Sequence, residues 1–300
     1  MSAVALAKLR GDSVEAIKEG VSECLQLINF EFRPSVQNIV VKPNLCYYWD
    51  YSTGETTDPR FVAATAELLR EKISPGVRVT VVESDASAMR CKHVFKMLGY
   101  EKMARDWGIE LVNLSEDENR PAEVTVAGQT FRFKMPKAIA EADLKINMPK
   151  IKYTIESLRI TCALKNIFGC NPYPRKFRYH PRLEETIVAL NKAMKFDLNL
   201  IDGNIVSGTS PRRLGLAMAS TDPVAIDAAA ACIAGINPRK IRYLKLASSE
   251  GIGSVEFVEK GEPLRHFAVA YPRKSLRRKL MGKAYNVAIR ASLGRRLGLE

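Results

Sequence analysis

Residues 143–152 read Asp143-Leu-Lys-Ile-Asn-Met-Pro-Lys-Ile-Lys152, a strand that ends among basic side chains. Its apolar residues alternate with polar ones up to Pro149, which is the pattern of a strand. Lys150 and Lys152 then lie in the loop beyond it. Ligands bind just past such strand ends in open α/β sheets. The stretch therefore predicts a fold class and a place for an anionic ligand, although a solvated basic loop is an alternative.

Strand-like and helix-like segments alternate along the rest of the chain. This alternation predicts an α/β fold, with mainly parallel strands and helices on both faces of the sheet. Residues 124–126 and 130–133 are separated by Ala-Gly-Gln and predict a hairpin that adds to the sheet in an antiparallel sense. The expected strands are 4–9, 39–41, 77–82, 109–114, 144–148, 198–201 and 214–218, and the expected helices are 13–28, 58–73, 95–107, 183–194 and those starting near 222 and 239.

One pattern occurs twice. Val40-Val-Lys-Pro-Asn44 precedes Thr56-Thr-Asp-Pro59, and Leu200-Ile-Asp-Gly-Asn204 precedes Ser220-Thr-Asp-Pro223. Each copy is a strand, a polar loop and a helix that starts with Thr-Asp-Pro. The repeat predicts two similar α/β halves, about 1–136 and 137–271, facing each other around a cleft.

The aspartate of each Thr-Asp-Pro has two interpretations. Asp58 and Asp222 can cap their helices, and a proline at the first helical position loses no needed hydrogen bond. Two helix starts beside a lysine-bearing loop would also present amide donors to an anion in the cleft.

Several motifs occur in a fixed order: Lys42-Pro-Asn-Leu45, Thr56-Thr-Asp-Pro59, Gly99-Tyr100, the lysine-rich segment, His180, Asp202-Gly203 and Thr221-Asp-Pro-Val-Ala-Ile-Asp227. In this series the chain resembles the family known as domain of unknown function 362, from about residue 42 to residue 261. The resemblance implies a fold more strongly than a function. Many members carry a ferredoxin-like cluster module and are described as iron–sulfur proteins, whereas this sequence contains no such module.

The polar residues at the expected strand ends and helix starts form the candidate site. Lys42 follows a buried strand, where a lysine is costly to bury unless it faces a cleft or a partner. The predicted ligand-binding residues are Lys42, Asn44, Thr57, Asp58, Lys150, Lys152, Asn166, Asp222 and Asp227.

Three residues are the catalytic candidates. His180, in the basic loop 171–182, is the best proton-transfer group at neutral pH. Lys165 precedes Asn166 near the carboxyl end of a helix that stops at Gly169. Asp202 ends a strand, where it could pair with a lysine, bind a metal or form a turn. The sequence thus favours an enzyme that binds an anionic small molecule, with its reaction and cofactor unknown.

The six cysteines include no Cys-x-x-Cys pair, which predicts reduced thiols in a cytoplasmic protein. Cys46, Cys162 and Cys170 lie beside the lysine and asparagine motifs. Three converging thiolates could hold an iron–sulfur cluster, so an iron–sulfur redox protein is an alternative function. Buried free cysteines of purely structural role are the simpler explanation.

The formal charge of +13 is concentrated at one end of the chain. After Tyr271 there are nine basic residues and one acidic residue, which leaves +5 for the α/β domain 1–271. Residues 272–300 predict a basic amphipathic helix, with apolar residues at 281, 285, 289, 293 and 297. Such a helix can pack on protein or lie on an anionic membrane, so peripheral membrane attachment is a further expectation. Binding of nucleic acid by these basic residues is less favoured.

Overall fold

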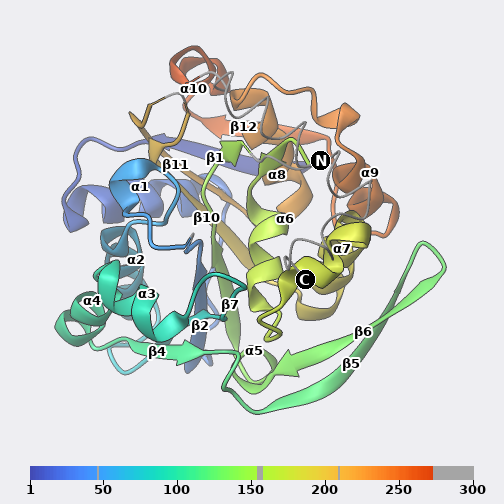
Figure 1. The fold of residues 1–300 in the computed structure, drawn as a ribbon. Coiled ribbons are helices and arrows are strands. Elements are labelled where there is room, and N and C mark those ends of the chain that lie inside the picture. Colours follow the sequence, from blue (N-terminus) through green and yellow to red (C-terminus); the bar gives the residue numbers. More distant parts are fainter. Residues whose placement is uncertain (46, 154–157, 209, 273–300) are drawn as a thin grey trace.

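The computed structural model describes residues 1–45, 47–153, 158–208 and 210–272. These residues form an eight-stranded sheet with helices around it (Figure 1). The strand order is β12-β1-β11-β10-β7-β2-β3-β4. The strands are β1 (Ser2–Lys8), β2 (Asn38–Pro43), β3 (Arg78–Glu83), β4 (Glu110–Asn113), β7 (Leu144–Met148), β10 (Leu198–Val206), β11 (Arg212–Ser220) and β12 (Phe257–Gly261).

The strands of this sheet are parallel except for β11, which pairs antiparallel with both β1 and β10. Parallel strands need helical crossovers, and these cover both faces. The helices are α1 (Val14–Leu27), α2 (Pro59–Lys72), α3 (Cys91–Met97), α4 (Tyr100–Trp107), α5 (Lys137–Ala140), α6 (Ala163–Asn166), α7 (Leu183–Met194), α8 (Pro223–Ile233), α9 (Arg242–Ser249) and α10 (Leu264–Ala270).

The two faces of the sheet have separate cores. Ile39 and Val41 of β2 pack with α1 to α4, whereas Val40 between them packs with α6 to α9 on the other face. Figure 1 shows the first helices on one side of the sheet and the later ones on the other. Successive side chains of a strand point to opposite faces, so a central strand buried on both sides is apolar throughout. The predicted fold class, a mainly parallel sheet with helices on both faces, is confirmed.

The two predicted halves do not face each other as separate sheets. β2 from residues 1–136 pairs in parallel with β7 from residues 137–271, over Ile39↔Leu144 to Pro43↔Met148. Strand pairing satisfies the edge backbone groups of both halves, which a cleft between them would leave open to water. The carboxyl ends of β2, β7 and β3 therefore lie side by side at one edge of a single sheet.

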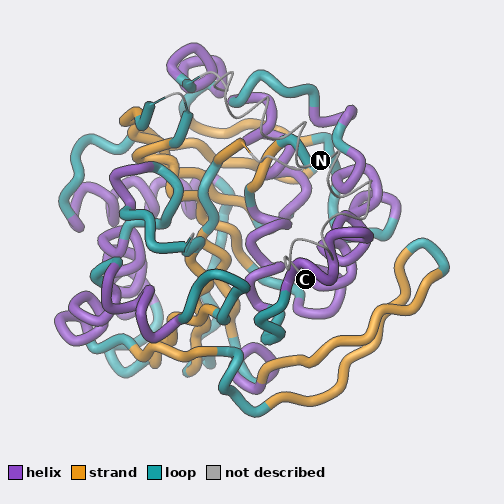
Figure 2. The backbone as a smooth tube through the Cα atoms, in the orientation of Figure 1, coloured by secondary structure: helices purple, strands orange, loops and turns teal. Residues whose placement is uncertain are grey.

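Two local predictions also need correction. The hairpin β5 (Asn119–Val126) and β6 (Gln129–Pro136) forms a two-stranded sheet of its own and does not extend the large one. It projects from the body of the molecule (Figure 2). The helix expected over 95–107 is two helices, α3 and α4, because Gly99 takes a left-handed conformation with φ 78° between them.

In the described part of the chain, no helix combines the length and the apolar character needed to cross a bilayer. The predicted basic helix over 272–300 falls almost wholly outside the described residues.

Candidate functional site

The buried lysines of the described residues all lie at the carboxyl edge of the sheet. They are Lys42 at the end of β2, Lys150 and Lys152 after β7, and Lys176, which contacts the residue after β3. Burying an ammonium group is costly unless a partner compensates it. Each of these four lysines is therefore expected to have a polar or charged partner.

Lys42 pairs with a carboxylate that the sequence analysis did not single out. Its Nζ lies 2.8 Å from Glu83 Oε2, and it donates a second hydrogen bond to the Pro43 carbonyl at 2.6 Å. Both side chains of the ion pair are almost fully buried. β2 and β3 are neighbours in parallel, so their carboxyl ends bring Lys42 and Glu83 together. The run Glu83-Ser84-Asp85 that ends a buried strand was the available sequence signal.

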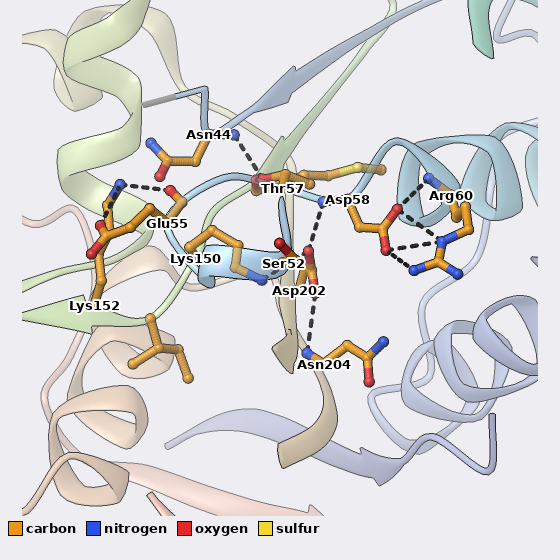
Figure 3. Close-up of polar contacts among 12 residues, drawn as sticks. Asn44, Ser52, Glu55, Thr57, Asp58, Arg60, Lys150, Lys152, Asp202 and Asn204 are labelled. Carbon is orange, nitrogen blue, oxygen red and sulfur yellow. Dashed lines mark hydrogen bonds and ion pairs between the residues drawn. The ribbon is translucent and has the colours of Figure 1, made fainter. Parts of the chain in front are cut away.

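Lys150 pairs with Asp202, as one interpretation of the sequence expected. The Nζ to Oδ2 distance is 2.9 Å (Figure 3). The carboxylate also accepts hydrogen bonds from the backbone amides of Asp58 and Asn204. Asp202 thus joins the loop after β7, the start of α2 and strand β10, and three nitrogen donors surround its carboxylate.

Lys152 is held by the loop that precedes α2. Its Nζ donates to the Glu55 carbonyl at 2.8 Å and lies 3.7 Å from Glu55 Oε2. Thr57 links the same loop to both strand ends, because its hydroxyl donates to the Met148 carbonyl and accepts from the Asn44 amide. These contacts fix the strand ends of β2 and β7 against the loop, and Figure 3 shows Lys152 beside Glu55 and Asn44 beside Thr57.

Lys176 has a different set of partners. It lies in the 3-10 helix η3 (Lys176–Arg182), and its Nζ is 2.5 Å from Ser84 Oγ and 3.5 Å from the Gly169 carbonyl. Ser84 in turn donates to the same carbonyl. None of the ion pairs within the described ranges includes Lys176. Burial lowers the pKa of Lys176 to about 8, against the opposing field of Glu83 and with help from the nearby Lys42 charge.

A chain of buried asparagines lies beside these lysines. Asn166 donates to the Lys42 carbonyl and to Asn147 Oδ1, and it accepts from Asn44. Asn147 donates to Asn199 Oδ1 on β10. The structure therefore brings together the predicted pair Asn44 and Asn166 from distant parts of the sequence, whereas Asn147 and Asn199 were not predicted.

The three other predicted aspartates stabilise helix starts. Asp58 accepts from the Arg60 amide and forms an ion pair with its guanidinium at 2.7 Å. Asp222 accepts from the first amides of α8. Asp227 accepts from the Ala163 and Leu164 amides at the start of α6, and burial raises its pKa to about 7. The capping interpretation holds for Asp58 and Asp222, and Asp227 holds the helix that carries Lys165 and Asn166.

The predicted catalytic residues other than Asp202 are less buried. Lys165 Nζ lies 5.9 Å from the centre of the Phe168 ring and is half-buried. The His180 ring packs edge-on against Phe177, with ring centres 4.8 Å apart. The basic loop 171–182 contains η3 and buries Lys176.

The cysteine candidates have different neighbours. Cys162 lies beside Asp227, and burial raises its pKa well above the ordinary value. Cys170 lies near Lys42, Glu83 and Lys176, and burial raises its pKa to about 12. Cys46 falls outside the described residues. Within residues 1–45, 47–153, 158–208 and 210–272, no group of three or more His, Cys, Asp or Glu side chains is arranged to hold a metal ion.

A cavity of about 460 Å³ lies between the start of α2 and helix α4. Arg60, Tyr51, Lys102 and Trp107 contribute to its wall. Of the predicted site residues, Asp58 alone lines it, and Asp58 is already paired with Arg60. This cavity is therefore not formed by the lysines at the carboxyl edge.

The fold and the buried lysines define an α/β protein with a charged carboxyl edge, and comparison with known proteins gives its family. A family model described as "Domain of unknown function (DUF362)" matches residues 39–232. The chain belongs to this family.

Two individual proteins show the range of similarity. The thylakoid-associated protein sll1697 of Synechocystis sp. is 29% identical over an alignment of 229 residues that covers 72% of this chain and 68% of that protein. Among solved structures, the lactate racemase apoprotein of Thermoanaerobacterium thermosaccharolyticum aligns with a TM-score of 0.48 and 11% identity. That alignment covers 79% of this chain and 58% of the racemase chain.

Proposed function

We propose that the protein is an enzyme that binds an anionic small molecule at the carboxyl edge of its sheet. The observation that carries this proposal is the gathering of four buried lysines there, of which three have carboxylate partners and the fourth, Lys176, has a hydroxyl and a carbonyl. A bound anion would give the protonated form of Lys176 the directly paired counter-charge that a carboxylate gives to each of the other three lysines.

The segment that carries Lys176 supports the proposal in a second way. Asn171, five residues earlier, is 1% exposed, and its Nδ2 is a buried donor with no partner in the described part of the chain. Buried donors are rarely left without an acceptor in native proteins. A carboxylate or phosphate oxygen is an acceptor of the required kind.

Isothermal titration calorimetry with inorganic phosphate, pyrophosphate and oxalate, at constant ionic strength, tests the proposal. We expect at least one of these probes to bind the wild-type protein, and binding to be lost in Lys176→Met. The control is Lys18→Met, which removes a lysine paired with Glu67 and Glu71 on the surface of α1. If none of the three probes binds, or if both variants lose binding equally, the proposal is wrong.

A second candidate is attachment of the protein to an anionic membrane surface through residues 272–300. Support comes from the excess of basic residues after Tyr271 and from the name of the thylakoid-associated relative. We expect the full chain to co-sediment with phosphatidylglycerol vesicles and not with phosphatidylcholine vesicles, and a chain ending at Tyr271 to remain in the supernatant. Equal sedimentation of both chains would exclude this candidate.

A further inference from the structure

Lys176 and Ser84 form a close pair inside a cluster of reactive groups. Besides the 2.5 Å contact between Nζ and Oγ, the cluster contains the ion pair Lys42–Glu83 and the Gly169 carbonyl. A Cβ built on Gly169 would lie 2.9 Å from Lys42 Nζ and 3.1 Å from Glu83 Oε1. Gly169 therefore touches the ion pair on one side and Lys176 on the other, so the two lysines share one small region.

Among the buried lysines, Lys176 is the one that can serve as a free amine. Lys42, Lys150 and Lys152 each lie within 4 Å of a carboxylate oxygen, so each amine is already engaged in an ion pair. Lys176 lies instead against a hydroxyl and a carbonyl. Burial is the main cause of its lowered pKa, the nearby Glu83 charge opposes that shift, and the Lys42 charge adds to it. A lysine that is desolvated and close to another cation is an activated nucleophile.

Lys176 is also the most exposed of the four, with 9% of its surface exposed against 7% for Lys152 and 1% for Lys42 and Lys150. The nearby thiols do not compete with it, because burial raises the pKa of Cys170 to about 12 and also raises that of Cys91. Because its pKa is lowered to about 8, Lys176 has far more free amine at pH 8 than an ordinary lysine with pKa 10.5.

We propose that the Lys176 amine, held against Ser84, condenses with the carbonyl group of an anionic substrate, of which a 2-oxo acid is the simplest class. This inference rests on the proposed function, because the carboxylate of the 2-oxo acid is the anion that the lysine-rich edge binds.

The reaction balances without an oxidant or a second substrate. The Nζ lone pair forms a bond to the carbonyl carbon, and the carbonyl oxygen takes up a proton to give a carbinolamine. The nitrogen supplies that proton, and it gives up its second proton as the hydroxyl leaves as water and the C=N bond of the imine forms. Ser84 Oγ accepts a hydrogen bond from Nζ, so it orients the nitrogen before the attack.

Reductive trapping of the wild-type protein tests the inference. The protein is incubated at pH 8 with glyoxylate or with the neutral aldehyde acetaldehyde, both with sodium cyanoborohydride, and the adducts are mapped by peptide mass spectrometry. We expect glyoxylate to label Lys176 at least about tenfold faster than Lys18, whose side chain is more exposed but whose pKa is raised by hydrogen bonds to Glu67 and Glu71. Acetaldehyde should show a smaller preference for Lys176.

Two variants complete the test. Lys176→Arg keeps the charge and should give no adduct at position 176, while Ser84→Ala keeps the amine and should slow labelling of Lys176. Labelling of exposed lysines alone, or equal preference for both aldehydes at Lys176, would overturn the inference. If phosphate or oxalate binds by calorimetry while Lys176 stays unlabelled, the inference fails and the proposed function stands.

Discussion

Lys150 and Asp202 form an ion pair whose side chains are 1% and 0% exposed, with Nζ and Oδ2 2.9 Å apart. The pair connects the loop after β7 to β10, across a junction where Lys150 and Asp202 also form an isolated parallel bridge. Asp202 additionally accepts the amide of Asp58, so the start of α2 depends on the same carboxylate.

Removing one partner of this pair should cost far more than removing a surface partner. We expect Asp202→Asn and Lys150→Met each to lower the free energy of unfolding by about 3–5 kcal/mol, because a buried charge is left alone. The double variant should lose less than the sum of the two. Urea unfolding of all four proteins measures this coupling. The exposed pair Lys102–Asp106 is the control, with a coupling expected below about 1 kcal/mol, and additive losses at Lys150 and Asp202 would contradict the prediction.

Gly169→Ala should destabilise the protein through packing. The new methyl group would lie 2.9 Å from Lys42 Cε and Nζ, inside a buried ion pair that cannot move without losing contacts. We expect a loss of about 1–3 kcal/mol in urea unfolding. Gly76→Ala is the matched control, since the nearest atom to its new methyl group is 3.9 Å away, and it should leave the stability nearly unchanged. Equal effects of the two substitutions would argue against this packing.

Asp227 should make the stability depend on pH. Its folded-state pKa is raised by burial to about 7 from an ordinary value of 3.8. Between these values the folded protein keeps the proton and the unfolded chain releases it, so stability falls as the pH rises from about 4 to 7. The full effect is about 4 kcal/mol. The side chain in Asp227→Asn does not titrate between about pH 4 and 7, so the free energy of unfolding of the variant relative to wild type should rise across this window. If the difference in unfolding free energy between the two proteins stays constant with pH, Asp227 does not have the raised pKa.

The asparagine chain should contribute to stability as a unit. Asn166→Ala removes the partner of Asn44 Nδ2, Asn147 Oδ1 and the Lys42 carbonyl. Buried polar groups left without partners cost about 1–3 kcal/mol each, so we expect a loss of at least about 2 kcal/mol in urea unfolding. Asn119→Ala, at the exposed start of the hairpin, serves as the control. A loss at position 166 no larger than at position 119 would mean that the network is not maintained in solution.

Sequence patterns predicted the parts of the fold that depend on local chemistry. The helix start at Asp58-Pro59, the helix Leu183–Met194 and the strand ending at Met148 follow from capping, periodicity and proline position. The partners of the lysines were mostly missed, because Glu83 and Ser84 lie more than 40 and 90 residues from Lys42 and Lys176. Strand order decides those contacts, and periodicity carries no information on strand order. Burial of Lys176 was also unexpected, because the loop 171–182 is basic and rich in proline, a composition typical of an exposed loop.

The most direct test of an anion site at the carboxyl edge is the anomalous difference map of a crystal soaked in sodium selenate, because selenium marks a bound oxyanion without ambiguity. The proposed function predicts a selenium peak at that edge. The oxygens of the selenate ion placed in it should lie within about 3.5 Å of the side-chain nitrogen of Lys176 or of another buried lysine there. Peaks confined to exposed arginines and lysines, with none at the carboxyl edge, would contradict it.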